Sequence, residues 1–346
     1  MRNLNMFLGM EVIIGRINGS ASDVEKNTNK SGYNNVSFTK KIGNRSKISG
    51  QNIKFNLNEY MEKVLSMETI SKSKEGKQVK YDIDPMRFMQ QDIFGFMLAE
   101  KIVISQEEFD KLDEAEKTLW KKEGKKGYSK NITKKRIARL QLNALVNVGY
   151  GRVEKEWNVC ASDGDSMPYV SEVYSGVHTT IANLDIENLG KFIISNNESQ
   201  FRDYDEAEAK VKDIRDLTNE ERLERVNAVL EAIEHLSIKS NQTNYLTDTT
   251  PKFVILGDYS WGNNAFGNAI INKDGINIEA LKEAIEQNED FRLGNIYIGV
   301  NNFFDDKYNT MKEELEEEFK DCDFIKVTNV HDAFKGYKEE LKNSLM

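Results

Sequence analysis

The sequence predicts a mixed α/β (α+β) protein whose core carries long insertions. Short runs of alternating apolar residues, typical of strands, lie between longer segments in which apolar residues recur at helical spacing. Polar or strongly basic stretches interrupt this order at several places. The chain has 346 residues with 39% hydrophobic content, enough for a sizeable core, and we expect one elaborated body, with two folding units as the alternative.

The first predicted elements are a strand, a polar loop and a helix. Residues 6–17 alternate between apolar and other side chains and predict a strand with one buried face. Residues 18–33 are rich in Asn, Ser, Gly and Lys and predict a long mobile connection. A helix follows, with Ser46 or Ser49 as its N-cap. Its apolar positions at helical spacing are Ile53, Leu57, Tyr60, Met61, Val64 and Leu65.

The middle of the chain is interpreted as inserted. Residues 79–98 contain an apolar-rich, helix-like piece, DPMRFMQQDIFGFM. A capping box, Ser105-x-x-Glu108, predicts a charged helix that continues to about Lys122. Residues 138–148 predict a strand or a buried segment. Residues 149–175 form two extended runs around the turn-forming sequence ASDGDSM, which predicts a protruding hairpin.

The remaining segments return to alternating strands and helices. Residues 177–186 predict a strand, and the capping box Thr218-x-x-Glu221 opens a long amphipathic helix. Its buried stripe consists of Leu223, Val226, Leu230, Ile233 and Leu236. The apolar run KFVILG predicts the next strand. The tail adds a short apolar run at 269–271, a helix at 278–285, a strand at 295–300, and two acidic helices around a strand at 324–327.

This order of elements is that of a ferredoxin-like β-α-β-β-α-β core with long insertions. The same sheet is the platform of the RNA-recognition-motif (RRM) domain, which stacks RNA bases on aromatic side chains. The sequence contains no K/R-G-F/Y-G/A-F-V-x-F/Y run. We therefore expect the insertions, and not an RNP motif on the sheet, to carry any RNA binding.

Charge is distributed very unevenly along the chain. The formal net charge of -9 argues at first against a nucleic-acid partner. Residues 24–54, however, contain seven bases and one acid, and residues 117–139 contain ten bases and one acid. Such runs are often solvated helix faces, but most of these bases lie outside good amphipathic helices. In the first island, Arg45 and Lys47 immediately precede a predicted helix N-terminus, whose N–H groups and dipole favour phosphate.

Several other classes of function find little support. Cys160 and Cys322 have no close partner and form no metal-ligand spacing with His178, His235 or His331, so we expect a reducing cytoplasm, no structural zinc and no cofactor. No apolar stretch approaches the length of a membrane span, and no phosphate-binding G-x-x-x-x-G-K-[ST] loop occurs. Asp163 and Asp165 are interpreted as hairpin-turn residues.

Four segments in order carry a resemblance to a known family. Residues 40–55, KKIGNRSKISGQNIKF, resemble the R-x-R-[VI]-S-[SG]-Q segment of CRISPR-associated Cascade backbone subunits, which belong to the RAMP superfamily. DIFGFM (92–97), EVYSGVHTTIANLDIENLGKF (172–192) and RLERVNAVLEAIEHLSIKSNQTNYLTDTTPKFVILG (222–257) are similar to segments of its DevR-like branch, used in type I-B systems. The loop SNQTNYLTD lacks the two glycines and the histidine that relatives often show, and the last 90 residues match no segment of the family.

The resemblance implies a hand-shaped, non-enzymatic subunit that binds CRISPR RNA (crRNA) as a helical oligomer for antiviral defence. Residues 1–66, 136–148 and 177–346 would form an RRM-like palm, residues 67–135 an inserted finger region, and residues 149–176 a thumb hairpin. The implied partners are crRNA, target DNA through the crRNA heteroduplex, further copies of the chain and other Cascade subunits, with no membrane. The expected RNA-binding residues are Lys40, Lys41, Arg45, Lys47, Ser49, Gln51, Lys54, Lys134, Lys135, Arg136 and Arg139. The expected thumb residues are Arg152, Lys155, Asp163, Asp165 and Met167.

Two alternatives remain open. Related type III backbone subunits cut target RNA with an aspartate in the loop after the first strand, where Asp23 lies here, and a carboxylate there could bind a metal ion that activates water. An exposed loop aspartate explains the same residue. The basic islands also fit a stand-alone RNA-binding regulatory protein, and copurification of a short uniform RNA with other subunits would distinguish it from a Cascade subunit.

Overall fold

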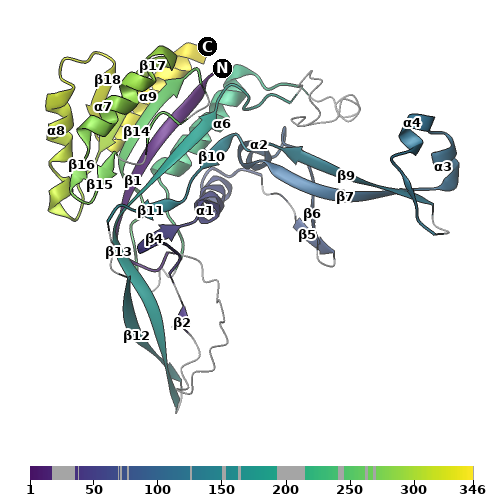
Figure 1. Cartoon of the computed structure of the whole chain (residues 1–346), viewed down its shortest axis with the longest axis horizontal. Helices are drawn as coiled ribbons and strands as arrows, with labels where there is room; N and C mark the ends of the chain where they lie inside the picture. Colours follow the sequence, from purple (N-terminus) through teal and green to yellow (C-terminus); the bar gives the residue numbers. More distant parts are fainter. Residues whose placement is uncertain are drawn as a thin grey trace. The chain divides into compact units, whose positions relative to one another are not determined.

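The computed structural model describes the chain as two compact units of mixed α/β structure (Figure 1). The described residues are 1–17, 36–37, 39–68, 70, 72–75, 78–124, 127–149, 153–162, 165–192, 215–240, 245–261, 264–267 and 270–345. The first unit comprises Met1–Thr69, Leu140–Leu189 and Asn219–Met346, and the second Ile70–Arg139 and Gly190–Thr218. The loop predicted at 18–33 lies outside the described residues.

The first unit is built on a large, mainly antiparallel sheet with the order β18-β17-β14-β1-β13-β11-β4-β3. Every residue from Asn3 to Val12 in β1 is buried, because helices cover both faces at this point. Additional strands β2, β10 and β12 pair with the long strand β13. The strands are β1 (Asn3–Gly15), β2 (Val36–Ser37), β3 (Lys41–Ile42), β4 (Arg45–Ile48), β10 (Leu140–Leu142), β11 (Leu145–Asn147), β12 (Val153–Ser162), β13 (Asp165–Asp185), β14 (Pro251–Tyr259), β17 (Arg292–Val300) and β18 (Ile325–Thr328).

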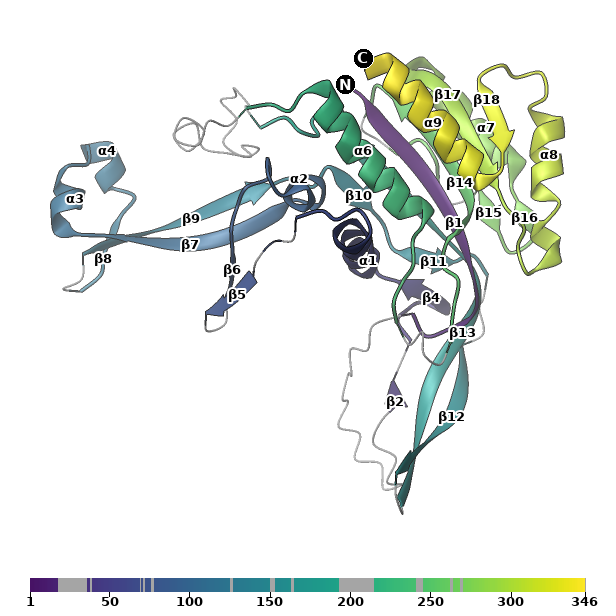
Figure 2. The ribbon, with the colours of Figure 1, turned by 180° about the vertical axis from the view of Figure 1, so that it is seen from behind.

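Helices form layers on the two faces of this sheet (Figures 1 and 2). On one face, α7 (Ile278–Gln287) and α8 (Met311–Glu318) pack on a core that includes Phe7, Phe253, Ile255 and Ile298. On the other lie α6 (Asn219–Glu234) and α9 (Val330–Leu345). Strand β17 approaches α9 so closely that a Cβ on Gly299 would lie 2.7 Å from Cα of Val330. Smaller elements are α1 (Gly50–Lys63), β15 (Ile271–Asn272), β16 (Gly275–Ile276), η1 (Glu289–Phe291) and η2 (Asp306–Tyr308).

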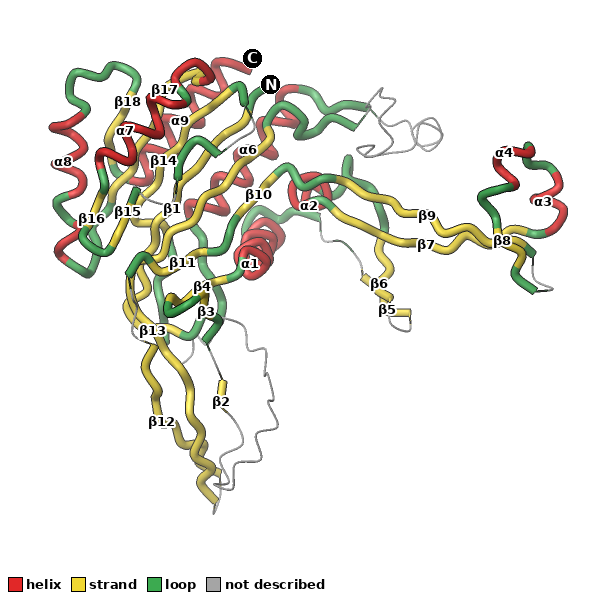
Figure 3. The backbone as a smooth tube through the Cα atoms, viewed as in Figure 1, coloured by secondary structure: helices red, strands yellow, loops and turns green. Residues whose placement is uncertain are grey.

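The predicted hairpin is confirmed and continues into the sheet without a break. Strand β12 pairs antiparallel with the first half of β13, from Val153↔Tyr174 to Ser162↔Asp165. The sequence predicts separate strands before and after residue 176, but β13 spans both. The junction is Gly176, whose φ of +117° is accessible to glycine and strained for other residues. Figure 3 shows β12 and β13 running together beyond the rest of the first unit's sheet.

The second unit contains two small antiparallel sheets. Strands β5 (Lys72–Glu75) and β6 (Gln78–Tyr81) form a hairpin, and β7 (Phe96–Ile104), β9 (Tyr128–Arg136) and β8 (Lys121–Lys122) form a three-stranded sheet in that order. The short helices are α2 (Met89–Phe94), α3 (Gln106–Asp110) and α4 (Glu114–Lys117).

Two helix predictions in this region are wrong in extent. The capping box of Ser105 and Glu108 is confirmed, but α3 ends at Asp110. Asp113 then caps a new helix by accepting a hydrogen bond from the backbone N–H of Glu116 at 2.7 Å. Asp side chains often bind nearby backbone N–H groups in this way, which interrupts a helix and starts another. Within 79–98 only Met89–Phe94 is an α-helix, because Gly95 at φ +66° ends it and β7 begins.

Most other elements agree with the predictions. The first helix begins directly after Ser49, which is its N-cap, and Ser46 is not. The helix with the Leu223–Val226–Leu230–Ile233 stripe, the KFVILG strand and the two C-terminal helices around β18 are confirmed. The boundaries proposed for palm, fingers and thumb remain predictions.

Candidate nucleic-acid interface

A short basic hairpin lies just before the first helix. Strands β3 and β4 pair through Ile42↔Arg45 and Lys41↔Ser46, and Gly43 takes a positive φ of +57° in the two-residue turn. Lys40, Lys41 and Arg45 are exposed, and Lys47 is half-buried. We call residues 40–47 the basic hairpin. It presents four cations within eight residues, and strand alternation places Arg45 and Lys47 on the same side of β4.

The other side of β4 is fixed to the sheet by a neutral hydrogen-bond chain. Ser46 is fully buried, and its Oγ lies 2.9 Å from Nε2 of His178, whose Nδ1 lies 2.9 Å from the carbonyl oxygen of Gly176. Burial lowers the pKa of His178 to about 4, so the ring is neutral near pH 7. Nδ1–H therefore donates to Gly176, and Nε2 accepts from the Ser46 hydroxyl. His178 thus has a structural role, because its ring links Ser46 of β4 to strand β13.

The start of α1 continues the surface of the basic hairpin. Ser49 Oγ accepts a hydrogen bond from the backbone N–H of Asn52 at 3.4 Å, which caps the helix. A Cβ at Gly50 would lie 2.8 Å from the carbonyl oxygen of Leu142, so glycine lets the helix begin against β10. Gln51 is exposed, and burial lowers the pKa of the half-buried Lys54. The sequence-predicted residues Arg45, Lys47, Ser49, Gln51 and Lys54 therefore lie in one continuous segment.

The basic hairpin is also tied to strand β13. The buried carboxylate of Glu172 accepts a hydrogen bond from the backbone N–H of Thr39 at 2.8 Å and lies 3.6 Å from Nζ of Lys41. In the sequence, Glu172 is distinguished only as part of a family motif. The structure gives Glu172 a clear role. Its buried carboxylate binds Thr39 and so holds the segment just before β3 against the base of the β12–β13 hairpin.

The structure describes the expected thumb residues only in part. Lys155 is exposed on β12, directly opposite Glu172. Asp165 and Met167 lie on β13, while Arg152 and Asp163 fall outside the described residues. On the opposite face of the hairpin, Glu156 accepts a hydrogen bond from the hydroxyl of Tyr245, which anchors the strand to the loop before β14.

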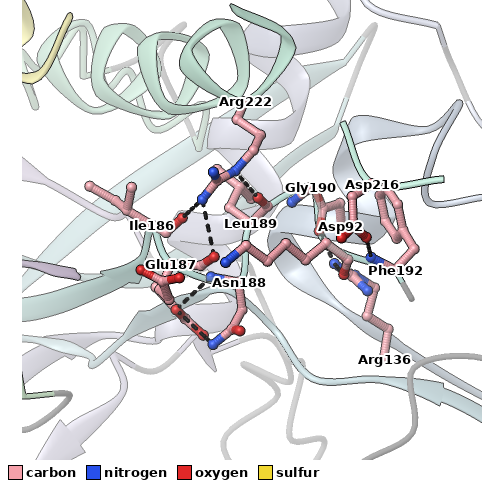
Figure 4. A network of polar contacts seen from close by, with 12 residues as sticks. Asp92, Arg136, Ile186, Glu187, Asn188, Leu189, Gly190, Phe192, Asp216 and Arg222 are labelled. Atoms are coloured by element: carbon pink, nitrogen blue, oxygen red, sulfur yellow. Dashed lines mark hydrogen bonds and ion pairs between the residues drawn. The ribbon is translucent and has the colours of Figure 1, made fainter. Parts of the chain in front are cut away.

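In the second basic island, the two arginines are buried, whereas Lys135 is exposed. Arg136 is buried, and its guanidinium group donates to the carboxylate of Asp92, including Nε to Oδ1 at 3.0 Å (Figure 4). Arg139 is 5% exposed. The prediction that these two arginines contact RNA therefore conflicts with their burial, because a strand binds only cations that it can reach. Lys135, the neighbour of Arg136 on β9, is exposed, and Lys134 lies on β9.

The same ion pair explains two of the sequence motifs. The aspartate of DIFGFM also accepts a hydrogen bond from the backbone N–H of Gly190 at 3.0 Å, and Arg136 lies over the ring of Phe192 at 4.5 Å. The glycine of that motif, Gly95, would clash through any Cβ with the carbonyl oxygen of Arg136 at 2.5 Å. Within the first unit, Arg222 separately donates to the carbonyl oxygens of Ile186, Glu187 and Leu189 (Figure 4). These motif residues therefore contribute to holding the fold together.

Catalytic and membrane features find no support in the described part of the chain. Among the residues that the structure describes, no three His, Cys, Asp or Glu side chains come together as a metal site, and Asp23 lies outside that part. His235, a histidine without metal-spaced partners in the sequence, stacks on Tyr60 with ring centroids 5.9 Å apart. No described helix has the length and apolar character to cross a membrane.

Comparison with known proteins identifies the family. Solved structures with similar chains include one described as a CRISPR RNA-guided surveillance complex (13% identity, TM-score 0.47, covering 88% of this chain and 91% of that chain). Another is described as a CRISPR RNA-guided surveillance complex, pre-nicking (11% identity, TM-score 0.49, covering 98% of this chain and 100% of that chain). No curated protein matches. The model of the family described as CRISPR-associated negative auto-regulator DevR/Csa2 matches residues 24–256, which is most of the chain. The chain therefore belongs to the CRISPR-associated DevR/Csa2 family.

Proposed function

We propose that the protein is the crRNA-binding backbone subunit of a type I-B Cascade surveillance complex. Several copies would line the guide RNA in the cytoplasm and present its spacer for pairing with target DNA. The observation that carries the proposal is the basic hairpin at 40–47, which exposes cations directly before the capped N-terminus of α1 in a chain of net charge -9. Phosphate contacts of this kind accept any spacer sequence, because they do not involve base edges.

Further support comes from the family and from the order of strands. DevR/Csa2 is a CRISPR-associated family by its description. The sheet places β14, β1, β13 and β11 side by side and antiparallel, with α1 after β1 and α6 between β13 and β14. This is the neighbour order expected of a ferredoxin-like, RRM-like palm. The β12–β13 hairpin then suits a thumb, and the second unit suits the fingers.

A stand-alone regulatory protein is the second candidate, because the family description names an auto-regulator. Purification of the chain from its native host distinguishes the two. A Cascade subunit brings a short uniform RNA and other protein subunits with it, whereas a stand-alone regulator does not. We assign the chain no catalytic role of its own in either case.

Reversal of two cations tests the RNA-binding role. The double substitution Arg45→Glu with Lys47→Glu should weaken guide-RNA binding to a similar degree for two unrelated spacers. For each phosphate that the variant no longer binds, the slope of log K against log salt should also fall by about 0.7. The measurement is fluorescence anisotropy of labelled RNA across a salt series.

A matched control has the same change in charge at another place. Lys320→Glu with Lys335→Glu reverses two exposed lysines near the acidic C-terminal end and should leave affinity and salt slope nearly unchanged. Equally weakened binding in the two double variants would mean that only net charge matters. Weakening confined to one spacer would argue for base readout and against the phosphate role.

A further inference from the structure

Strand β13 carries a buried carboxylate that lysines of two different segments can reach. Glu172 is buried, and one of its carboxylate oxygens lies 3.6 Å from Nζ of Lys41 in the basic hairpin. Lys155 on β12 is its direct partner in the strand register. Side chains opposite each other in an antiparallel pair share a face, with Cβ atoms roughly 4.5–5.5 Å apart. Glu172 therefore has one cation in the basic hairpin and a second on the neighbouring strand of the β12–β13 hairpin.

The contacts of Glu172 differ in strength. The backbone N–H of Thr39 donates to its carboxylate at 2.8 Å, the usual length of a hydrogen bond to an anion. The ammonium of Lys41, at 3.6 Å, lies beyond the roughly 2.7–2.9 Å of a charge-assisted hydrogen bond, and 38% of the Lys41 side chain is exposed. The Lys41 side chain can therefore turn to another anion while Thr39 keeps the carboxylate in place.

The carboxylate of Glu172 opposes the binding of phosphate by Lys41. An ion pair that is partly exposed to water contributes little to stability, so a phosphate can displace it. A phosphate at Lys41 then lies close to the buried carboxylate, and the two anions repel each other. A buried carboxylate also needs a new counter-charge when its partner leaves. Lys155 is placed to supply this charge, because it is exposed and lies opposite Glu172.

We propose that Glu172 is an internal competitor of RNA, which pairs with Lys41 in the free protein and with Lys155 when a phosphate binds Lys41. This inference rests on the proposed RNA-binding function and adds a regulation of the same site. The exchange of partners connects the basic hairpin to the β12–β13 hairpin, since Lys155 and Glu172 lie on the two strands of the latter. Occupancy of the basic hairpin thus changes the contacts at the base of the β12–β13 hairpin.

Removal of the charge of Glu172 is the first test. Glu172→Gln keeps an oxygen that accepts the hydrogen bond from Thr39 but no longer attracts Lys41. The affinity for a labelled RNA of mixed sequence should therefore rise by about 1.5- to 5-fold, the range that corresponds to one partly exposed ion pair. The matched control is Glu154→Gln, which removes an exposed acid of β12 and changes the net charge equally, and it should raise the affinity less. An equal rise in the two variants would overturn the proposal.

Substitution of the two lysines shows whether Glu172 acts through Lys41. In a Lys41→Met background, Glu172→Gln should raise the affinity no more than the control does, because the cation for which carboxylate and phosphate compete is absent. Lys155→Met should weaken RNA binding by about 1.5- to 5-fold in the otherwise wild-type chain, since Glu172 then holds Lys41 more firmly, and should have little effect beside Lys41→Met. A Lys155 that binds phosphate directly weakens binding by the same factor in both backgrounds, and this result would contradict the exchange of partners.

The outcomes separate this proposal from the proposed function. If Arg45→Glu with Lys47→Glu weakens binding while Glu172→Gln matches Glu154→Gln, the competition is wrong and the RNA-binding role stands. If neither the charge reversal nor Glu172→Gln changes the affinity, the RNA-binding role itself is wrong.

Thermal melting controls for folding, because Glu172 is buried. Glu172→Gln should melt near the wild-type temperature, since it keeps the hydrogen bond from Thr39. If this variant does not fold, the comparison of Lys155→Met with and without Lys41→Met decides the question, because it leaves Glu172 in place. An equal effect of Lys155→Met in the two backgrounds would then overturn the proposal.

Discussion

The two basic islands look alike in the sequence and have different roles in the fold. In the first, Ser46 and His178 hold β4 through neutral hydrogen bonds, and most cations of the basic hairpin are exposed. In the second, β9 is held by the buried ion pair of Arg136 with Asp92. The basic hairpin of the first island thus keeps most of its cations at the surface. In the second island, Arg136 forms a buried ion pair that stabilises the fold.

The comparison of the two islands shows the limit of counting charges along a sequence. Such a count gives the net charge of a segment, but it does not tell which charged side chains are exposed to a ligand. One base of the second island is also paired with an acid just outside it: Nζ of Lys117 lies 3.0 Å from Oε1 of Glu114. The first island is therefore the stronger candidate for an RNA surface, although it contains fewer bases.

The largest effect is expected from breaking the ion pair of the second island. Asp92→Asn keeps the shape of the side chain and leaves the Arg136 guanidinium buried without its counter-charge. Removal of one partner of a buried pair costs about 3–5 kcal/mol of unfolding free energy. The measurement is urea denaturation of the full chain.

The neighbouring cation provides the control for this prediction. Lys135→Ala changes an exposed residue of the same strand and should alter the unfolding free energy by no more than about 0.5 kcal/mol. Replacing both partners by apolar residues, Asp92→Leu with Arg136→Met, should recover much of the stability. Comparable stability of Asp92→Asn and Lys135→Ala would remove the distinction between the islands.

A second, smaller effect concerns pH and the neutral anchor of the first island. The folded pKa of His178 is about 4, below the ordinary value of 6.5, so the unfolded chain binds a proton here before the folded chain does. Its contribution to stability is fully present above pH 6.5 and disappears as the pH falls toward 4. The decrease amounts to about 3 kcal/mol.

Comparison with a non-titrating variant isolates this contribution from that of the carboxylates. The stability advantage of the wild type over His178→Gln should shrink steadily between pH 6.5 and 4 in chemical denaturation. A constant difference across this range would show that the imidazole is not buried in its neutral form. Asp92→Asn should not alter the His178 contribution, because the two anchors are in different units.

The smallest effect is expected at the helix cap beside the basic hairpin. Ser49→Ala should cost about 1 kcal/mol, because α1 loses its capping hydrogen bond. Ser49→Asp restores a cap and should retain stability, yet its negative charge should weaken RNA binding if phosphate lies at this helix end. Thermal melting and RNA anisotropy measure the two effects separately. Unchanged RNA affinity in Ser49→Asp would place the phosphate away from α1.

Much of the fold could be predicted because its signals are local. Ser49 caps α1, the first strand and the stripe of α6 are confirmed, and ASDGDSM lies at the end of the β12–β13 hairpin. The single buried face predicted for that strand is wrong, because Asn3 to Val12 are buried on both faces. The charged helix predicted after Ser105 is too long, because Asp113 starts a second helix instead of continuing the first.

The sequence by itself determined the elements, the hairpin, the family resemblance and the position of the first basic segment, since each depends on residues close in the chain. Only the tertiary structure decided which charged groups are exposed. Arg136 and Asp92 are 44 positions apart in the sequence, and Ser46 and His178 are 132 positions apart. No local sequence pattern can therefore predict either contact. Because these groups are buried away from water, each needs a hydrogen-bond partner within the protein, and the packing of the chain decides which partner lies close enough. The same packing leaves Arg45 exposed at the surface.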